Sequence, residues 1–221
     1  LDVFATFEGD NNVLLQLVGK RLLSDYAKQF KGADAKALAK FAAVSTAERV
    51  FHGAGLRRLG QSVADFGQTA RSVQLGLRAE QQHELLTGRV EQMIADIAAA
   101  LRPASKMSQQ DAAAVFNQHQ SELIEAARAH GELLQWEAFA QGVERIEDEG
   151  TRQVLVWLRD LFGLTLIERH LAWYLINGRL STQRAAAVTS YIDRLCARLR
   201  PHAQDLVDAF GFAPEHVRAP I

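Results

Sequence analysis

The part of this chain best equipped for chemistry lies close to its first residue. Residues 6–11 read TFEGDN, so the carboxylate of Glu8 stands between Phe7 and Gly9, directly before an apolar-periodic segment. A loop of this composition would place one acidic side chain at the N-terminus of the helix that follows. If the ring of Phe7 keeps water away from Glu8, the pKa of the carboxyl rises and the group can act as a general base. The plainer alternative is a solvated loop glutamate that the dipole of the following helix favours.

Other residues that could take part in catalysis or metal binding do not have the spacing that such sites require. The HGAG run at 52–55 follows a predicted helix and lacks the Lys-Ser/Thr ending of a phosphate loop, which favours a helix break. His83 and His170 have no His or Asp partner at metal-ligand spacing, which favours edge positions. Cys196 lies in an apolar helical stretch, where a small buried residue is the default. We therefore expect no metal site.

Helices must position these groups. The chain has only four prolines, good helix formers dominate it, and no alternating strand pattern occurs, so the predicted class is all-α. Asp10 or Asn11 can cap the first helix, whose apolar residues recur every three or four positions as far as Phe30. The remaining predicted helices are 35–51, 66–101, 108–144, 151–176 and 181–199, with a short one after Pro201 and a core that contains Trp136, Trp157 and Trp173. One helical bundle, or two stacked half-bundles, fits this pattern.

Composition excludes several classes of protein. The 221 residues carry a net charge of -1, which does not favour a nucleic-acid partner or an anionic membrane. No apolar run approaches the roughly 20 residues of a membrane span, and no signal peptide is visible. The single cysteine, Cys196, fits a reducing compartment, and residues 219–221 are not a peroxisomal address. The predicted location is cytoplasmic.

Two stretches near opposite ends of the chain resemble one superfamily. Residues 6–11, followed by VLLQLV at 13–18 and KRLL at 20–23, resemble the stretch that opens the C-terminal helical domain of acyl-CoA dehydrogenases and acyl-CoA oxidases. The Asp-Asn pair after Glu-Gly looks more like the oxidases and the long bacterial dehydrogenases related to them. Residues 199–203 (LRPHA) and 206–210 (LVDAF) resemble the extra C-terminal helical domain of the oxidases.

The resemblance implies a reaction and a role for each residue of the loop. Such enzymes remove a proton from the α-carbon of an acyl-CoA thioester, while a hydride leaves the β-carbon for flavin N5. Glu8 would be the base, and its backbone N–H would bind the thioester carbonyl together with a flavin hydroxyl. Gly9 would lie against the substrate, where a side chain would collide. Asp10, Asn11 and Asn12 would line FAD.

The resemblance also implies what surrounds this chain. Residues 1–60 would begin the dehydrogenase-type helical domain, and residues 61–221 would form the oxidase-type helical domain. The N-terminal helical domain and the β-domain, which hold most of the flavin and CoA contacts, are not in this sequence. We therefore expect that the chain alone binds neither FAD nor acyl-CoA tightly, and that it forms a homo-oligomer. Phe7 stands where the family often has Tyr, which keeps an aromatic wall and removes a hydroxyl.

A second hypothesis is a free-standing helical module that docks a partner through an apolar face. Such a module does not need a Glu-Gly-Asp-Asn loop, and it should begin with Met. This chain begins with Leu1, so we expect a fragment of a longer protein.

Overall fold

The structure, a computed structural model, describes residues 11–30 and 77–212, and within these two ranges every regular element is a helix. The elements are α2 (Asn11–Phe30), α6 (Ala79–Leu101), the 3-10 helix η1 (Arg102–Lys106), α7 (Gln109–Gln118), α8 (Gln120–Glu144), α9 (Glu149–Arg169), α10 (Leu171–Ile176), α11 (Thr182–Leu199), the 3-10 helix η2 (Arg200–His202) and α12 (Ala203–Asp208). The predicted all-α class is confirmed. Among these described helices, none combines the length and apolarity that a bilayer crossing requires.

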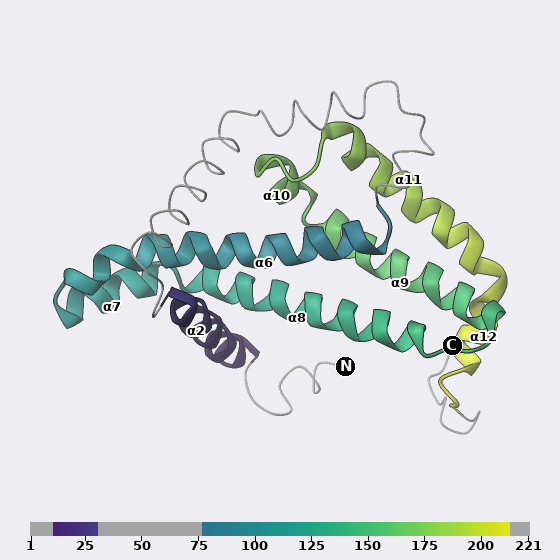
Figure 1. The fold of residues 1–221 in the computed structure, drawn as a ribbon, viewed down its shortest axis with the longest axis horizontal. Coiled ribbons are helices and arrows are strands. Elements are labelled where there is room, and N and C mark those ends of the chain that lie inside the picture. The colour runs from purple at the N-terminus through teal and green to yellow at the C-terminus, as the bar shows by residue number, and fades with distance from the viewer. Residues whose placement is uncertain (1–10, 31–76, 213–221) are drawn as a thin grey trace, which may run out of the picture.

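Helices α6 and α8 lie side by side along the long axis and form the centre of the described part (Figure 1). Helix α9 packs on both, α11 packs on α9, and α2 packs mainly on α8. The largest fully buried apolar side chains are Tyr174, Leu77, Leu123, Leu164, Ile167, Leu180, Leu195 and Val188. Because burying one such aliphatic side chain stabilises a fold by about 1.5–3 kcal/mol, this shared core joins the helices into one unit.

Three helix starts carry the side-chain caps that the sequence marks. Ser108, Asp148 and Ser181 each accept a hydrogen bond from the backbone N–H three residues further on, at 3.2, 2.7 and 3.2 Å. Each bond satisfies a donor that the first turn of a helix leaves unpaired. The predicted starts of these helices agree with the structure, with α9 beginning two residues before the predicted Thr151.

Two of the predicted long helices are each divided at a histidine. The predicted helix 108–144 breaks at His119, and the predicted helix 151–176 breaks at His170. At these residues φ is -104° and -113°, and the backbone N–H bonds to the carbonyl three residues back, at 3.1 and 3.2 Å. Such a bond tightens the turn and gives the next helix a new direction. Neither site has Gly or Pro, so helical periodicity alone predicted one continuous helix in each case.

Helix α9 approaches its neighbours closely beside Trp136, which is 4% exposed. The indole N–H of Trp136 donates to Gln82 Oε1 at 3.2 Å, and Gln82 Nε2 donates to the carbonyl of Leu77 at 2.9 Å. Gly163 of α9 faces this pair. A Cβ at Gly163 would overlap Gln82 Oε1 and the indole nitrogen and would lie 2.8 Å from Trp136 Cδ1. Glycine is therefore required here by space rather than by backbone conformation.

Other predictions about burial are only partly confirmed. Trp136 is a core residue, whereas Trp157 and Trp173 lie partly buried at the edge of the core. The prediction for Cys196 was wrong, because its side chain is exposed. Leu195 is buried on the side of α11 that faces the core. The next residue lies about 100° further round the helix, so the side chain of Cys196 points away from the core.

Candidate functional site

The predicted catalytic loop meets the described structure at the start of α2. Glu8, Gly9 and Asp10 lie outside the described residues. Asn11 and Asn12 form the first turn of α2, which begins where the sequence predicts a cap. The structure therefore places the element that follows the loop, and the roles of Glu8, Gly9, Asp10, Asn11 and Asn12 stay predictions.

A hollow of about 410 Å³ opens at this end of α2. Asn11, Leu14, Leu15 and Val18 line it from α2, and Arg128 lines it from α8. Sites for organic ligands typically combine an apolar lining with a few polar groups. The lining of this hollow combines one amide and one guanidinium with three aliphatic side chains.

Helix α2 packs on α7 and α8 through three side-chain contacts. Later residues of α2 meet earlier residues of the α7–α8 segment. These contacts are Asn12 Oδ1 with Arg128 Nη2 at 3.3 Å, Gln16 Nε2 with Gln120 Oε1 at 3.4 Å, and the Lys20 ammonium with the Phe116 ring at 5.8 Å from its centre. The three α2 residues are four positions apart, so they form one stripe along the helix. Helix α2 therefore runs antiparallel to α8, with its first turn beside Arg128.

Gly19 marks a close contact between α2 and α8. A Cβ added there would lie 2.5 Å from Cγ of Leu123 and 3.1 Å from the Leu123 carbonyl oxygen. Leu123 is 1% exposed and belongs to the core, so it has little room to move. The absence of a side chain at Gly19 therefore allows the short distance between α2 and α8 at this point.

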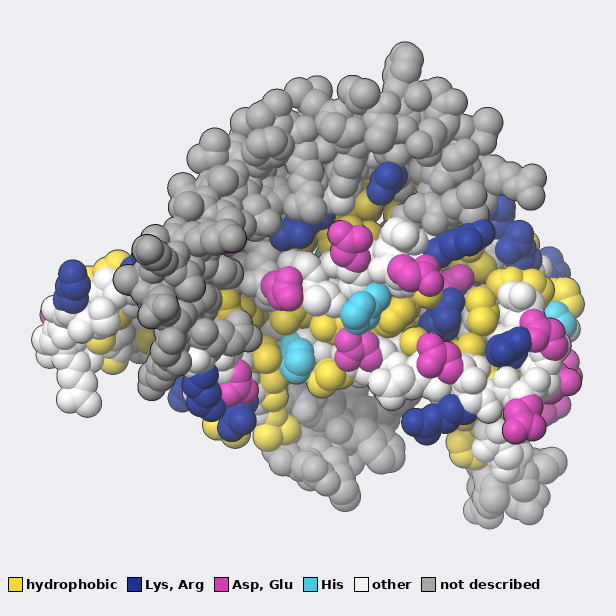
Figure 2. Space-filling view, in the orientation of Figure 1, with side chains coloured by type: hydrophobic (Ala, Val, Ile, Leu, Met, Phe, Trp, Pro, Cys, Tyr) yellow, Lys and Arg dark blue, Asp and Glu magenta, His cyan; other side chains and the backbone are white. Residues whose placement is uncertain are grey.

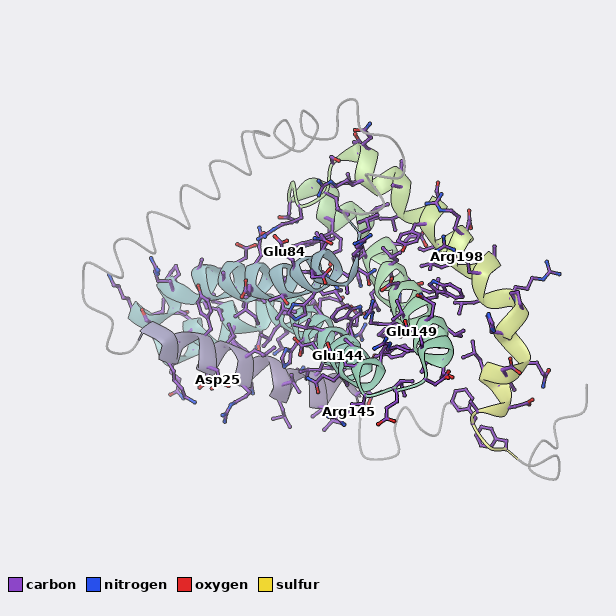
Figure 3. The ribbon with its side chains drawn as sticks, turned by 45° about the vertical axis from the view of Figure 1, so that its right-hand side comes forward. Asp25, Glu84, Glu144, Arg145, Glu149 and Arg198 are labelled. Atoms are coloured by element: carbon purple, nitrogen blue, oxygen red, sulfur yellow. The ribbon has the colours of Figure 1, made fainter. Side chains whose placement is uncertain are left out.

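Another side of α2 presents apolar side chains to solvent. Val13, Leu14, Leu17 and Val18 are 55%, 41%, 59% and 39% exposed. Further along this helix, Asp25 pairs with Arg21 and Lys28 (Figure 3). A contiguous apolar stripe on an amphipathic helix normally meets a further surface.

Histidine and acidic side chains lie next to one another over α6 and α8 in the middle of the face that Figure 2 shows. His83 Nε2 is 2.8 Å from Glu137 Oε1, and the His83 ring lies 5.6 Å from the ring of Trp136. The His83 side chain is 45% exposed, which agrees with the predicted edge position. The described ranges hold no group of three or more His, Cys, Asp or Glu side chains arranged to bind a metal ion.

Three basic side chains surround the Glu132 carboxylate of α8. Its carboxylate lies 3.1 Å from Arg89 of α6, 3.4 Å from Arg169 of α9 and 3.6 Å from His170 between α9 and α10. Burial alone would raise the pKa of Glu132, but the nearby His170, with the charges of Arg89 and Arg169, outweighs burial and lowers the pKa of this carboxyl below its usual value. A carboxylate held ionised in this way is a poor base for a C–H proton, and it ties the helices together instead.

We expect Glu132→Gln to destabilise the protein by about 2 kcal/mol at neutral pH, because Arg89, which is only 4% exposed, loses its counter-charge. The folded pKa of Glu132 is lowered, so the carboxylate stabilises the fold above its unfolded pKa, and this contribution is lost as the pH falls through the folded pKa. Urea unfolding at several pH values measures the difference between the variant and the wild type.

The difference should be full near pH 7 and should shrink below about pH 4.5. Glu144→Gln is the control, because Glu144 is an exposed glutamate at the end of the same helix (Figure 3). An equal loss of stability at pH 7 and at pH 3 would contradict the electrostatic role of Glu132.

Arg128 is the lining residue that sequence reasoning missed. It is 116 positions from Asn12 in the chain, and its surroundings on α8 contain no motif. A hydrophobic period locates the helix that carries such a residue but does not reveal which distant side chain it meets.

Comparison with known proteins finds similarity to one family. The sequence pattern described as "Acyl-CoA oxidase" matches residues 78–221. Over 228 residues, covering the whole chain, 27% are identical to acyl-coenzyme A oxidase 2, peroxisomal, of Arabidopsis thaliana, of which 30% is covered. Over 224 residues, 99% of the chain, 27% are identical to acyl-coenzyme A oxidase 2 of Yarrowia lipolytica, of which 29% is covered. The chain thus spans about 30% of the length of these relatives.

Solved structures share the fold. Acyl-CoA oxidase 1 from Yarrowia lipolytica superposes with a TM-score of 0.75 at 21% identity, over 99% of this chain and 29% of that chain. Acyl-CoA oxidase 1 from Arabidopsis thaliana superposes with a TM-score of 0.71 at 25% identity, over 97% of this chain and 30% of that chain. The all-α arrangement described above is therefore the arrangement of a helical segment of these oxidases.

Proposed function

The chain belongs to the acyl-CoA oxidase family, and on that premise we propose that it is the C-terminal part of an FAD-dependent acyl-CoA oxidase or dehydrogenase of fatty-acid β-oxidation. The observation that carries the proposal is the similarity to oxidases along the whole chain, including the segment around Glu8, together with coverage of only about 30% of those relatives. The reaction would be α,β-dehydrogenation of an acyl-CoA thioester. Whether oxygen or an electron-transfer partner reoxidises the flavin is an outcome of the experiment below.

Glu8 and Gly9 of the loop would each have a separate role in the reaction. The Glu8 carboxylate would accept the α-proton, which leaves an electron pair to form the Cα=Cβ bond as a hydride departs from the β-carbon. The backbone N–H of Glu8 would bind the thioester carbonyl oxygen, where negative charge develops. Gly9 would let the thioester approach the backbone closely. When bound, FAD supplies the acceptor for the hydride.

The hollow beside the start of α2 supports the flavin part of this proposal, because its lining residues would suit an edge of the cofactor. Asn11 and Arg128 supply polar groups, and Leu14, Leu15 and Val18 supply an apolar surface, around a hollow of about 410 Å³. Together with Asp10 and Asn12, Asn11 would hold an edge of FAD in the complete protein. A whole dinucleotide needs further walls, which the missing domains would supply.

The exposed apolar stripe of α2 supports the place of this chain in a larger protein. Val13, Leu14, Leu17 and Val18 would pack against the N-terminal domains of the same polypeptide or line the acyl-CoA and flavin site. The same stripe would favour the alternative of a docking module, which predicts no flavin chemistry. Our proposal further includes a domain boundary near residue 60, a homo-oligomer and a cytoplasmic location.

The test compares the full gene product with the 221-residue chain. We expect the full protein to carry the visible absorption of bound FAD, and we expect an acyl-CoA added without oxygen to bleach it. The 221-residue chain should bind no flavin, because most of the flavin contacts would lie in the further domains that this proposal assigns to the full gene product. Flavin recovered with this chain in a 1:1 ratio would contradict that expectation, and a colourless full protein that ignores acyl-CoA would favour the docking module. Rapid recovery of colour on admitting oxygen would identify an oxidase.

A further inference from the structure

Three large apolar side chains lie exposed at the C-terminal end of the described structure. Val207, Phe210 and Phe212, here called the C-terminal cluster, are 62%, 74% and 68% exposed. Val207 belongs to α12, and the two phenylalanines follow that helix. Gly211 has a φ of 67°, so the chain turns between the phenylalanines. Their rings lie 6.1 Å apart with planes 13° from parallel, which forms one aromatic surface that faces solvent.

Charged side chains of opposite sign lie next to the C-terminal cluster. Arg198 and Arg200 precede it, at the end of α11 and in η2, and Asp205 and Asp208 lie in α12 itself. All four residues are exposed. The patch therefore has a basic side, an acidic side and an apolar centre. An exposed apolar area with a polar border is typical of an interaction site.

The fold holds these groups at one end of the bundle. The ring of Trp157 on α9 lies 6.2 Å from the ring of His202, and the Arg198 guanidinium lies 5.8 Å from the centre of the Trp157 ring. These contacts join the end of α11 and the 3-10 helix η2 to α9, and α12 follows directly. Helix α12 lies at the opposite end from α7 (Figure 1), and apolar side chains and charges of both signs lie together at this end (Figure 2).

The charges decide which partner fits this patch. Arg198 contacts a neutral ring and Asp208 accepts a hydrogen bond from the neutral amide of Gln204 at 2.9 Å, so these contacts leave both charges available to a partner. An anionic membrane or a nucleic acid would attract the two arginines but would repel Asp205 and Asp208 in the same patch. A second copy of this chain presents both signs of charge. In a two-fold dimer one patch serves both partners, so the basic side of each protomer can meet the acidic side of the other.

We propose that the C-terminal cluster is a dimerisation surface for a second copy of this chain. The apolar side chains of the two clusters pack on each other, and Arg198 and Arg200 of one protomer face the acidic side of its partner. An apolar core within a polar rim is the usual arrangement of a specific interface. The inference gives the proposed homo-oligomer its surface and requires no flavin chemistry, so its failure and the failure of the proposed dehydrogenation are separate results.

The first test compares two apolar side chains that are equally exposed. In the full gene product, Phe210→Ser should raise the dissociation constant of the assembly about 10-fold or more, because aromatic side chains at the centre of an interface carry much of the binding free energy. Ile176→Ser is the matched control, since Ile176 is also 74% exposed but lies on α10, away from α12 (Figure 1). Its dissociation constant should stay at the wild-type value. Sedimentation velocity over a range of protein concentrations measures both.

The second test reverses the charges on each side of the patch. One variant carries Arg198→Glu and Arg200→Glu, and the other carries Asp205→Arg and Asp208→Arg. Each variant alone has charges of one sign on both sides, so like charges repel and it should sediment as a smaller species than the wild type. An equimolar mixture restores opposite charges across the interface and should recover the wild-type mass. Both variants should keep the wild-type urea midpoint.

Four results would overturn the proposal. They are a wild-type protein that stays monomeric at every concentration, an unchanged dissociation constant in Phe210→Ser, an equal loss in Phe210→Ser and Ile176→Ser, and a mixture that stays dissociated although both charge variants keep their urea midpoint. Recovery of mass on mixing requires that both variants are folded, and it supports this surface even if acyl-CoA does not bleach the protein.

Discussion

Glu8→Gln in the full gene product should lower kcat for acyl-CoA dehydrogenation by about 1,000-fold, which lies within the range that a positioned general base contributes. Glutamine keeps the shape of the side chain and the backbone N–H that would bind the thioester carbonyl, but it cannot accept the α-proton. Binding of FAD and of acyl-CoA should therefore persist. The measurement is the rate at which acyl-CoA bleaches the flavin in a single turnover without oxygen.

Two further variants make this result specific to the base. Glu8→Asp keeps the carboxylate but shortens its reach by one methylene, so its rate should fall between those of the wild type and Glu8→Gln. Asp2→Asn removes a carboxylate outside the TFEGDN motif and should leave the rate unchanged. A rate for Glu8→Gln within a few-fold of the wild type would refute the assignment of the base and would leave the family membership intact.

Gly163→Ala should destabilise the fold by about 3 kcal/mol, although alanine is the better helix former by about 1 kcal/mol. The added Cβ would overlap Gln82 Oε1 and the indole nitrogen of Trp136, which are joined by a hydrogen bond of 3.2 Å. Gln82 and Trp136 are 0% and 4% exposed, so a displaced donor or acceptor would find no water to replace the lost partner. Urea unfolding should show a midpoint lower by roughly 1 M.

Glycines with open surroundings provide the matched control. Gly142 and Gly131 lie within α8, and a Cβ at either position would meet nothing within 4 Å. Gly142→Ala and Gly131→Ala should therefore stabilise the protein by about 0.5–1 kcal/mol each, through helix propensity alone. An unchanged or raised midpoint for Gly163→Ala would show that α9 can move away from Trp136 without loss.

The helix starts were predictable because their causes are local. Ser108 and Ser181 each satisfy a backbone N–H three residues away, and an isolated sequence displays that spacing. The breaks at His119 and His170 were not predictable, because neither residue is a known helix breaker. His170 lies 3.6 Å from Glu132, which is 38 positions earlier in the chain, so the end of α9 is tied to a contact that periodicity does not record.

The predictions of which side chains are buried differ in the same way between local and long-range causes. Trp136 is buried as predicted, since α8 packs against both α6 and α9, whereas Cys196 is exposed although its neighbours are apolar. The side of α11 that meets α9 decides this: Leu195 and Leu199 lie on that side, and Cys196 lies outside it. The candidate site shows a related limit. The TFEGDN motif can be read from the chain, and Arg128 cannot.

By itself, the sequence determined the helical class, the starts of α2, α7, α9 and α11, and the family to which the loop with Glu8 points. Only the tertiary structure decided which distant residues meet, namely Arg128 with Asn12, Leu123 with Gly19, and the Gln82–Trp136 pair with Gly163. The physical reason is the separation along the chain over which each kind of interaction acts. Helix periods and caps act within about four residues, whereas each of these contacts joins side chains from two different helices, which come together only when the core is packed.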